Sequence, residues 1–154
     1  TYDSTDVTAA TATQNVNDGS ARTLATTKTV NAWRMAPGAA ITNTYNNGVG
    51  LTIASGGLIS NAGFTISHSA AADARSNFIT SGTGELVYWV NQNTNGFNIP
   101  VTGAIDLIKT GPGTLNLNPG STLTGTVTSG NATITMAKGA GPFMTRASRS
   151  GESA

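Results

Sequence analysis

The spacing of the strand-forming segments is the feature that most constrains this chain. Between residues 50 and 137, short apolar stretches alternate with turn residues, so that each strand and its turn occupy about nine residues. Crossover helices between strands need more room than this spacing leaves. The sequence therefore predicts an all-β fold. The strands expected are 28–35, 40–45, 50–54, 57–60, 63–67, 77–80, 85–90, 97–101, 104–108, 114–118, 122–128 and 132–137.

Most of these stretches carry apolar side chains at every second position. In residues 85–90, for example, Leu86, Tyr88 and Val90 share one face. This period of two is typical of strands that are buried on one side. The same alternation relates Leu51 to Ile53, Phe64 to Ile66, Ile105 to Leu107, Leu115 to Leu117, and Ile134 to Met136.

Glycine corners indicate how the strands connect. Antiparallel hairpins favour two-residue Asn-Gly or Asp-Gly loops, which occur only at 18–19, 47–48 and 95–96. Most other corners are single or paired glycines, which bend the chain without reversing it. A chain that only bends stacks each turn on the last, so we expect a parallel β-helix with strands about 4.8 Å apart. An antiparallel β-sandwich is the alternative. The predicted corner residues are Gly56, Gly57, Gly82, Gly84, Gly111 and Gly113.

Composition excludes several classes of partner. Thr, Gly, Asn and Ser supply nearly half of the chain and charged residues only 10%, so hydroxyls and amides must keep the surface hydrated. A net charge of +1 without a basic stripe predicts no nucleic-acid partner. The absence of cysteine excludes disulfides and thiolate metal sites. No apolar run reaches the ~20 residues of a transmembrane helix, so we expect no membrane insertion of this segment. The opening TYDS is not the start of a signal peptide, so we expect that a leader has been removed or that the chain is an excised piece.

The segment LIKTGPGTLNLN (107–118) combines a short strand, a Gly-Pro-Gly corner and a Leu/Asn alternation. Leu115 and Leu117 are expected to stack into the core, while Asn116 and Asn118 face outward or join amide ladders with neighbouring strands. The segment contains no catalytic pattern and is typical of a scaffold.

This segment also resembles a known repeat. Residues 84–118 look like the repeat associated with autotransporter passenger domains, whose signature is L-x-K-x-G-x-G-T-L-x-L. Segments 29–35, 51–59 and 81–86 are similar to the region that precedes it in large surface proteins of Gram-negative and related bacteria, so the resemblance covers roughly residues 28–118. The matching positions are Leu107, Lys109, Gly111, Gly113, Thr114, Leu115 and Leu117.

The resemblance implies a right-handed β-helical passenger, secreted to the outside or the outer surface of a bacterium. It implies no single activity, because passengers include adhesins, proteases and esterases. The chain departs from the family where PGSTLTG (119–125) replaces the usual Asn-Thr-Tyr-x-Gly segment, and no outer-membrane barrel strands follow. Residues 138–154 match no familiar pattern. They are interpreted as a disordered tail or an arm that docks on a neighbouring subunit.

Catalytic patterns are weak throughout the chain. His68, the one histidine, has Ser69 and Asp73 near it in sequence, but no Gly-x-Ser-x-Gly elbow accompanies them. Asp73, Glu85 and Asp106 are the carboxylates of the repetitive part, and Asp106 is expected to face outward and pair with Lys109 or Arg75. These residues predict no enzyme, no cofactor and no metal site.

A ligand contact is better supported by an aromatic pair. Tyr88 and Trp89 must point to opposite faces of their strand, so one of them should be exposed. Beside Asn91 and Asn93, it could stack on a sugar ring or on a partner surface. The candidate ligand or partner contacts are therefore Tyr88, Trp89, Asn91 and Asn93, and the alternative is that the aromatic side chain packs at a corner of the core.

The chain is expected to comprise an N-terminal edge, cap or partly ordered arm (1–27), a β-helical repeat domain (28–137) and a C-terminal tail or arm (138–154). Its predicted function is that of a non-enzymatic structural or adhesive element outside the cell. Uncapped strand edges predict self-association into an oligomer or filament, and a glycan or host surface is the other expected partner. The alternatives are a carbohydrate-binding or carbohydrate-cleaving β-helix and a trimeric phage fibre segment.

Overall fold

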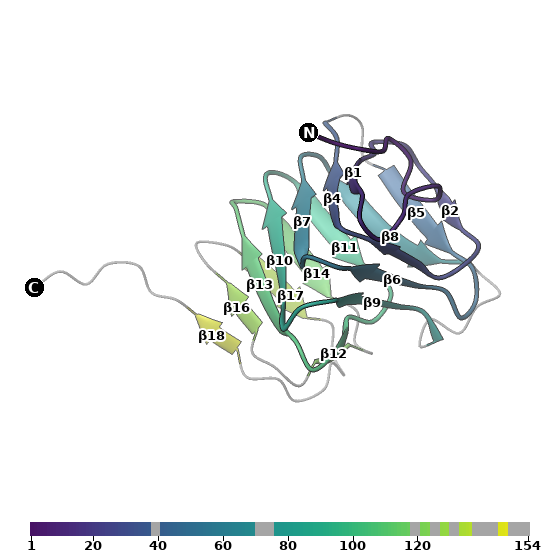
Figure 1. The fold of residues 1–154 in the computed structure, drawn as a ribbon. Helices are drawn as coiled ribbons and strands as arrows, with labels where there is room; N and C mark the ends of the chain where they lie inside the picture. The colour runs from purple at the N-terminus through teal and green to yellow at the C-terminus, as the bar shows by residue number, and fades with distance from the viewer. Residues whose placement is uncertain are drawn as a thin grey trace, which may run out of the picture.

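The computed structural model describes residues 1–37, 41–69 and 76–117, residue 121, and the backbone of 122–123, 127–129, 133–136 and 145–147. Within these residues the chain is all-β and contains no α-helix (Figure 1). The same residues include no helix with the length and apolarity needed to cross a membrane.

The strands follow one another in a fixed order. From β1 to β15, the strands fall into consecutive groups of three. In each group the first strand joins sheet 1, the second joins sheet 2, and the third joins sheet 3 or its continuation. Sheet 1 contains β1 (Asn15–Asn17), β4 (Ala32–Met35), β7 (Gly57–Ser60), β10 (Glu85–Val90), β13 (Asp106–Thr110), β16 (Val127–Ser129) and β18 (Thr145–Ala147). Sheet 2 contains β2 (Thr23–Leu24), β5 (Ile41–Tyr45), β8 (Phe64–His68), β11 (Thr94–Phe97), β14 (Thr114–Leu117) and β17 (Thr133–Met136). Sheet 3 contains β3 (Lys28–Val30), β6 (Gly50–Ile53) and β9 (Phe78–Ser81), and its continuation pairs β12 (Thr102–Gly103) with β15 (Thr122–Leu123).

Strand pairing in the described residues is parallel throughout. From β1 to β14, each strand except β9 pairs with the strand three positions further along the chain, and β16 pairs with β18. In sheet 1, for example, Tyr88 of β10 lies opposite Leu58 of β7 on one side and Lys109 of β13 on the other. The alternative prediction of an antiparallel β-sandwich is therefore wrong. Parallel sheets connected in this order are consistent with a parallel β-helix.

Several predicted strand boundaries are confirmed and others are corrected. The strands predicted at 57–60 and 85–90 are observed with those bounds, as β7 and β10. The strand predicted at 28–35 is two strands, because the chain passes from sheet 3 to sheet 1 at Asn31. The strand predicted at 97–101 is also corrected. The observed strand, β11, ends at Phe97 and contains the Asn-Gly pair that resembles a hairpin turn.

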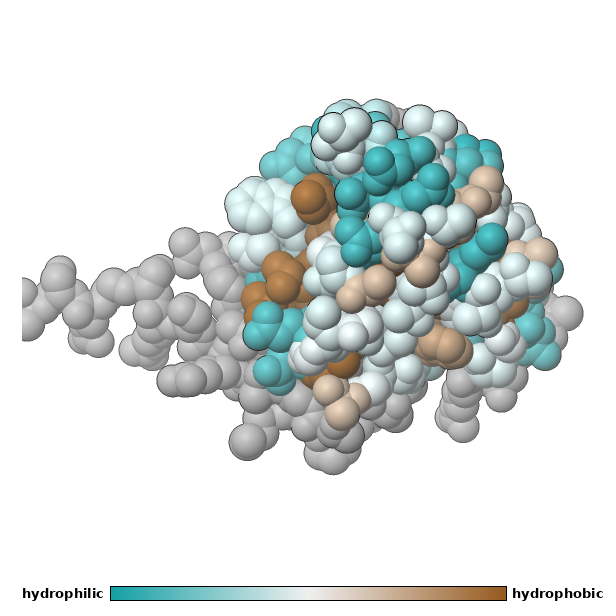
Figure 2. Space-filling model, in the orientation of Figure 1, coloured by the Kyte–Doolittle hydropathy of each residue, from teal (hydrophilic) through white to brown (hydrophobic). Residues whose placement is uncertain are grey.

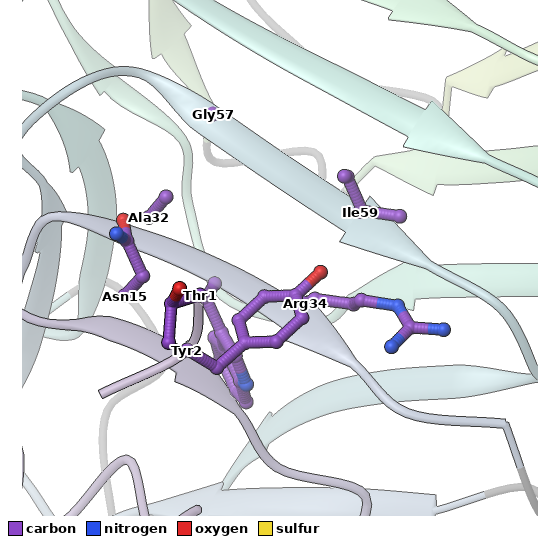
Figure 3. A pocket seen from close by; sticks show the side chains of 8 residues that line it. Thr1, Tyr2, Asn15, Ala32, Arg34, Gly57 and Ile59 are labelled. Carbon is purple, nitrogen blue, oxygen red and sulfur yellow. The ribbon is translucent and has the colours of Figure 1, made fainter. Parts of the chain in front are cut away.

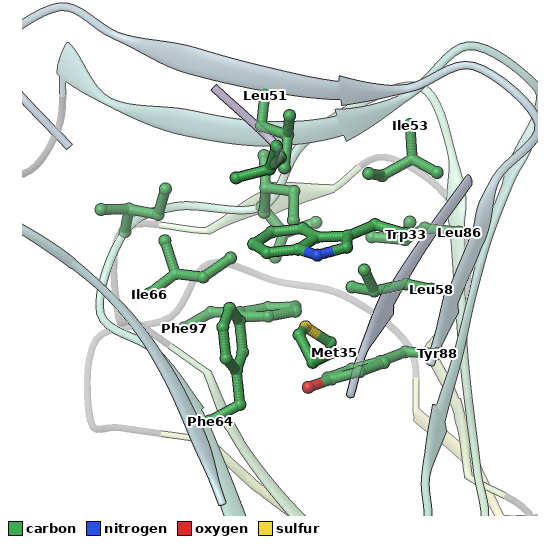
Figure 4. Packing of buried hydrophobic residues seen from close by; sticks show 14 of the residues in the cluster. Trp33, Met35, Leu51, Ile53, Leu58, Phe64, Ile66, Leu86, Tyr88 and Phe97 are labelled. Carbon is green, nitrogen blue, oxygen red and sulfur yellow. The ribbon is translucent and has the colours of Figure 1, made fainter. Parts of the chain in front are cut away.

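The core lies between the three sheets (Figure 4). Trp33, Leu58 and Tyr88 follow one another across sheet 1 in register. The Trp33 ring meets Phe64 of sheet 2 edge to face at 5.2 Å, and Tyr88 stacks on Phe97 at 5.1 Å. Because each buried aliphatic or aromatic side chain stabilises the fold by roughly 1.5–3 kcal/mol, this column is the main source of stability.

The first residues cover the end of the core next to β1. Val7, in this N-terminal cap (residues 3–14), is completely buried. The Asp18 carboxylate, also buried, accepts a hydrogen bond from the Val7 backbone N–H (3.0 Å) and one from Nε of Arg22 (2.8 Å). Arg22 also pairs with Asp6 at 3.2 Å, and a hydrogen bond from Thr8 lowers the pKa of Asp6. The carboxylate of Asp18 therefore ties the cap to the first strands.

Two predicted corners have the backbone conformation that favours glycine. Gly56 and Gly111 adopt φ values of 76° and 80°. A Cβ atom on Gly111 would strike the Val90 carbonyl oxygen, and one on Gly56 would strike that of Glu85. Both glycines therefore allow a sharp bend that lies directly against the backbone of β10.

The other predicted corner glycines differ in their constraints. Gly82 and Gly113 lie against neighbouring backbone, and a Cβ on either would come within 2.8 Å of a carbonyl oxygen. Gly57 is the first residue of β7, so its prediction as a corner is corrected. Gly84 has open space around the position of a Cβ.

Candidate binding face

The outer face of sheet 1 is built by the alternation in β10. Leu86, Tyr88 and Val90 are buried, and the side chains between them point to solvent. Trp89 is 44% exposed and Val87 is 36% exposed. The predicted division between one buried and one exposed aromatic is therefore confirmed.

Tyr88 is the buried member of the pair, which corrects its prediction as a ligand contact. It is 0% exposed, and its hydroxyl donates a hydrogen bond to Oδ1 of Asn95 at 2.9 Å. Burial raises the pKa of the Tyr88 phenol. Its role is to pack and to satisfy a buried amide, because no ligand can reach it.

Trp89 belongs to an apolar stripe that spans the two neighbouring strands β7 and β10. In the register of sheet 1, Trp89 lies next to Ile59 of β7, and Val87 lies next to Ile108 of β13. Ile59, Val87 and Trp89, here called the apolar stripe, are among the few large exposed apolar side chains of the described residues. Figure 2 shows apolar groups on the left of the molecule, over the region of β7 and β10.

The outer face of sheet 2 has a different chemistry. Its outward side chains carry hydroxyl or amide groups instead of large apolar groups. Among the side chains that the structure describes, they are Thr23, Thr42, Thr44, Thr65, Ser67, Thr94, Thr114 and Asn116. The apolar stripe is therefore a local property of sheet 1 and does not follow from the general composition of the chain.

An open groove adjoins the apolar stripe at its N-terminal end (Figure 3). It has a volume of about 340 Å³ and lies between the first two residues and the outer face of sheet 1. Ile59 belongs to both the groove and the apolar stripe, so the two surfaces are continuous. The groove is lined by Thr1, Tyr2, Asn15, Ala32, Trp33, Arg34, Gly57 and Ile59.

Arg34 provides the positive charge of this groove. Its Nη1 donates to Oδ1 of Asn17 at 3.2 Å. When the Asn61 amide is oriented to satisfy both of its polar atoms, its oxygen accepts from Nε and Nη2 of Arg34 at 2.8 and 3.2 Å. The Tyr2 ring centroid lies 5.6 Å from the guanidinium carbon, within the range of a cation–π contact. Two amides and an aromatic ring thus hold the guanidinium in place.

Asn91 and Asn93 lie at the corner that follows Trp89, and both are exposed. Asn93 adopts a positive φ of 62°, which asparagine tolerates better than most residues. Its carbonyl oxygen accepts a hydrogen bond from the Thr114 N–H at 2.9 Å. The side chains of both asparagines stay candidate ligand contacts beside the exposed indole.

Among the catalytic candidates that the structure describes, His68 lies far along the chain from Glu85 and Asp106 and on a different sheet. His68 is half-buried, and its Nδ1 lies 3.0 Å from the carbonyl oxygen of Ser69. Asp73 lies outside the described residues. Glu85 and Asp106 are register partners on β10 and β13, so two carboxylates lie side by side on the outer face of sheet 1. Neither belongs to the groove at Arg34.

Lys109 corrects a second prediction. The sequence predicts Lys109 or Arg75 as the partner of Asp106 on the outer face, but Lys109 points inward and is buried, and Arg75 lies outside the described residues. Nζ of Lys109 donates to the carbonyl oxygens of Gly111, at 2.6 Å, and Gly113. Burial lowers the pKa of its ammonium group. The alternation with Leu107, two residues earlier, contains the signal that this side chain faces inward.

The predicted ligand contacts include none of the residues that line the groove, among them Arg34 and Tyr2. The sequence does contain a signal for Arg34. Neighbouring residues of a strand point to opposite faces, so burial of Trp33 places Arg34 on the outer face. Tyr2 carries no such signal, because it lies before the first strand. Its place beside Arg34 depends on how the N-terminal residues fold back over sheet 1.

The described residues contain no group of three or more His, Cys, Asp or Glu side chains arranged to hold a metal ion. Comparisons of the chain with protein families, curated proteins and solved structures give no match.

Proposed function

We propose that this chain is a right-handed parallel β-helix that serves as a non-enzymatic structural or adhesive element of an extracellular bacterial surface protein. The outer face of sheet 1 is its adhesive surface. The observation that carries the proposal is the apolar stripe of Ile59, Val87 and Trp89 on a fold whose other large sheet is polar outside.

The β-helical part of the proposal is supported by strand order and by the corners. Pairing with the third strand along the chain is the pattern expected when a chain winds around three faces. The Gly111 corner and the inward Lys109 lie in the segment that resembles the autotransporter-associated repeat. The bacterial surface location rests on that resemblance.

The adhesive part is supported by the exposure of the Trp89 indole to solvent, which is unfavourable in free energy. A large apolar group on a flat sheet face gains free energy when a partner covers it, and such exposed patches mark interaction sites. The neighbouring Asn91, Gln92 and Asn93 side chains supply donors and acceptors for a hydroxyl-rich ligand. A sugar ring offers both an apolar face and hydroxyls.

Binding of the purified chain to immobilised glycans and to bacterial or host cell surfaces tests this proposal. Trp89→Ala should reduce binding at least about tenfold, because covering a large apolar side chain stabilises a complex by roughly 1.5–3 kcal/mol. Asn116→Ala, on the outer face of sheet 2, is the matched control and should bind like the unaltered chain. Unchanged binding by Trp89→Ala would contradict the adhesive role of this face.

Self-association is the second candidate. Strand edges at an uncovered end of stacked sheets are templates for another chain. The N-terminal cap covers the end beside β1, so a filament would have to form through the other end or through the face of sheet 1. Electron microscopy of the purified chain separates a single particle, a trimer of the phage-fibre kind and an open filament.

Carbohydrate cleavage is favoured only by the adjacency of Glu85 and Asp106. Paired carboxylates can hydrolyse glycosidic bonds when their separation and protonation suit the reaction. Release of reducing sugar from a bound polysaccharide, abolished in Glu85→Gln and Asp106→Asn, would support this candidate over the non-enzymatic one.

A further inference from the structure

We propose that the groove at Arg34 recognises a carboxylate of an acidic glycan, while a neighbouring sugar ring of the same glycan stacks on Trp89. This inference rests on the proposed adhesive function and names the chemistry of its ligand. It is supported by the position of three side chains on the outer face of sheet 1. The guanidinium of Arg34, the aliphatic side chain of Ile59 and the exposed indole of Trp89 lie in one row across the strands.

The charge of Arg34 has no carboxylate partner among the described residues. Both ion pairs there belong to Arg22, which pairs with Asp6 of the N-terminal cap and with Asp18. Arg34 instead contacts the neutral side chains of Asn17, Asn61 and Tyr2. Neutral partners fix the position of a cation without neutralising it, so the groove keeps a positive charge.

The hydrogen bonds of Arg34 leave a defined pair of donors. A guanidinium has five N–H groups. Nε and one N–H of Nη2 face Asn61, and one N–H of Nη1 faces Asn17. One N–H remains on each terminal nitrogen. The terminal nitrogens of a guanidinium can donate together to the two oxygens of a carboxylate in a bidentate arrangement.

The spacing of the strands relates this donor pair to the aromatic platform. Arg34, Ile59 and Trp89 are in register on β4, β7 and β10. Two strand spacings of about 4.8 Å place the backbone of Trp89 roughly 10 Å from that of Arg34. Ile59 lies between them and presents an apolar contact. A linear ligand that crosses the strands would meet a cation, an aliphatic side chain and an indole in turn.

These chemistries favour a glycan over other polymers. A peptide cannot add a strand here, because the backbone of β4, β7 and β10 is already paired on both sides. One cation is too little charge for a nucleic acid, whose binding depends on several phosphate contacts. An acidic oligosaccharide carries the carboxylate, the hydroxyls for Asn91 and Gln92 and the apolar ring face on one molecule.

The test uses an array of oligogalacturonate, sialyllactose, their carboxyl-reduced counterparts and neutral oligosaccharides. The unaltered chain should bind at least one carboxylate-bearing glycan, and reduction of its carboxyl groups should weaken binding about tenfold or more. Arg34→Gln should cause a similar loss. Arg34→Lys keeps the charge but removes the bidentate donor pair, so its binding should fall between the two.

The controls separate this inference from the proposed function. Asn116→Ala should bind normally, and circular dichroism should show the same strand signal in every variant. Binding of neutral and reduced glycans that depends on Trp89 but not on Arg34 would overturn this inference and leave the adhesive role standing. Binding of no glycan by the folded chain, or binding of peptide or nucleic-acid probes only, would overturn the inference. If Trp89→Ala also left cell-surface binding unchanged, the adhesive role would fall with it.

Discussion

Gly111 occupies a backbone position that a side chain cannot share. Its φ of 80° is unfavourable for other residues, and a Cβ atom there would strike the Val90 carbonyl oxygen. Gly111→Ala is therefore expected to lower the free energy of unfolding by at least about 2 kcal/mol. Urea unfolding followed by circular dichroism measures the change.

The matched control is Gly84→Ala. Gly84 is exposed, and nothing lies within 4 Å of the position of its Cβ. This variant should stay within about 0.5 kcal/mol of the unaltered chain. Equal effects of the two substitutions would mean that the corner at Gly111 is not fixed as described.

Lys109 is expected to make the free energy of unfolding depend on pH in the alkaline range. Burial lowers the pKa of its ammonium below the ordinary lysine value of 10.5. In the range between the lowered pKa and 10.5, the unfolded chain holds this proton and the folded protein does not. Unfolding therefore takes up a proton, and raising the pH through this range should increase the free energy of unfolding.

Lys109→Met isolates this effect. Burial raises the pKa of the Tyr45 and Tyr88 phenols, so near pH 10 the tyrosines make the folded protein less stable as the pH rises. Both chains share these tyrosines, so the difference between their free energies of unfolding removes that contribution. The difference, unaltered chain minus Lys109→Met, should become more positive as the pH approaches 10.5. A difference that stays constant or falls would show that the lysine keeps its proton in the folded protein.

At the scale of elements, the N-terminal cap depends on one buried carboxylate. Asp18 accepts hydrogen bonds from Val7 in the cap, from the Ser20 N–H and from Arg22. Asp18→Ala leaves the Val7 and Ser20 N–H groups without this acceptor and leaves Arg22 with Asp6 as its only carboxylate partner among the described residues. It is expected to cost about 2–3 kcal/mol, at the lower end for a buried pair because Arg22 is partly exposed.

Asp3→Ala is the control for Asp18→Ala. The Asp3 carboxylate also accepts a backbone N–H, that of Asn15, but the contact is exposed to solvent. Thermal unfolding should therefore change much less for Asp3→Ala. A loss as large as that of Asp18→Ala would mean that burial does not distinguish the two carboxylates.

The strands that the sequence predicts well are those with an uninterrupted alternation. In residues 57–60 and 85–90, buried and exposed side chains alternate without a break. The ends of this alternation are therefore also the ends of the observed strands. The turn at Asn31 was missed because neither Gly nor Pro marks it. The Asn95-Gly96 pair resembles a hairpin signal, but the Asn95 side chain points inward and accepts a hydrogen bond from the Tyr88 hydroxyl. That contact joins two strands and is invisible in either segment alone.

The candidate binding face was predictable only in part. The exposed aromatic follows from the alternation of residues 85–90, and the choice between Tyr88 and Trp89 needed the direction of the core. The partnership of Arg34 with Ile59 and Trp89 depends on the register between β4, β7 and β10, whose members are tens of residues apart. No local pattern contains a register of that kind.

At the scale of the whole molecule, the sheet order predicts where the fold opens first. β7 and β10 have a strand on each side, whereas β1 has β4 on one side and only the bridge between Ser4 and Val16 on the other. When each strand depends on its neighbours, unfolding from an end breaks fewer contacts than unfolding from the middle. Amide hydrogen exchange should therefore be slowest in β7, β8, β10 and β11 and faster in β1 and β2.

The cap variant tests whether this order has the stated cause. Asp18→Ala removes the contact that holds the cap on the end of the core, so exchange in β1 and β2 should become faster still. Exchange in β10 should change little, because its neighbours β7 and β13 are untouched. Exchange that accelerates equally in all strands would show that the molecule opens as one unit, and the sheets would then be coupled more strongly than contact between neighbouring strands explains.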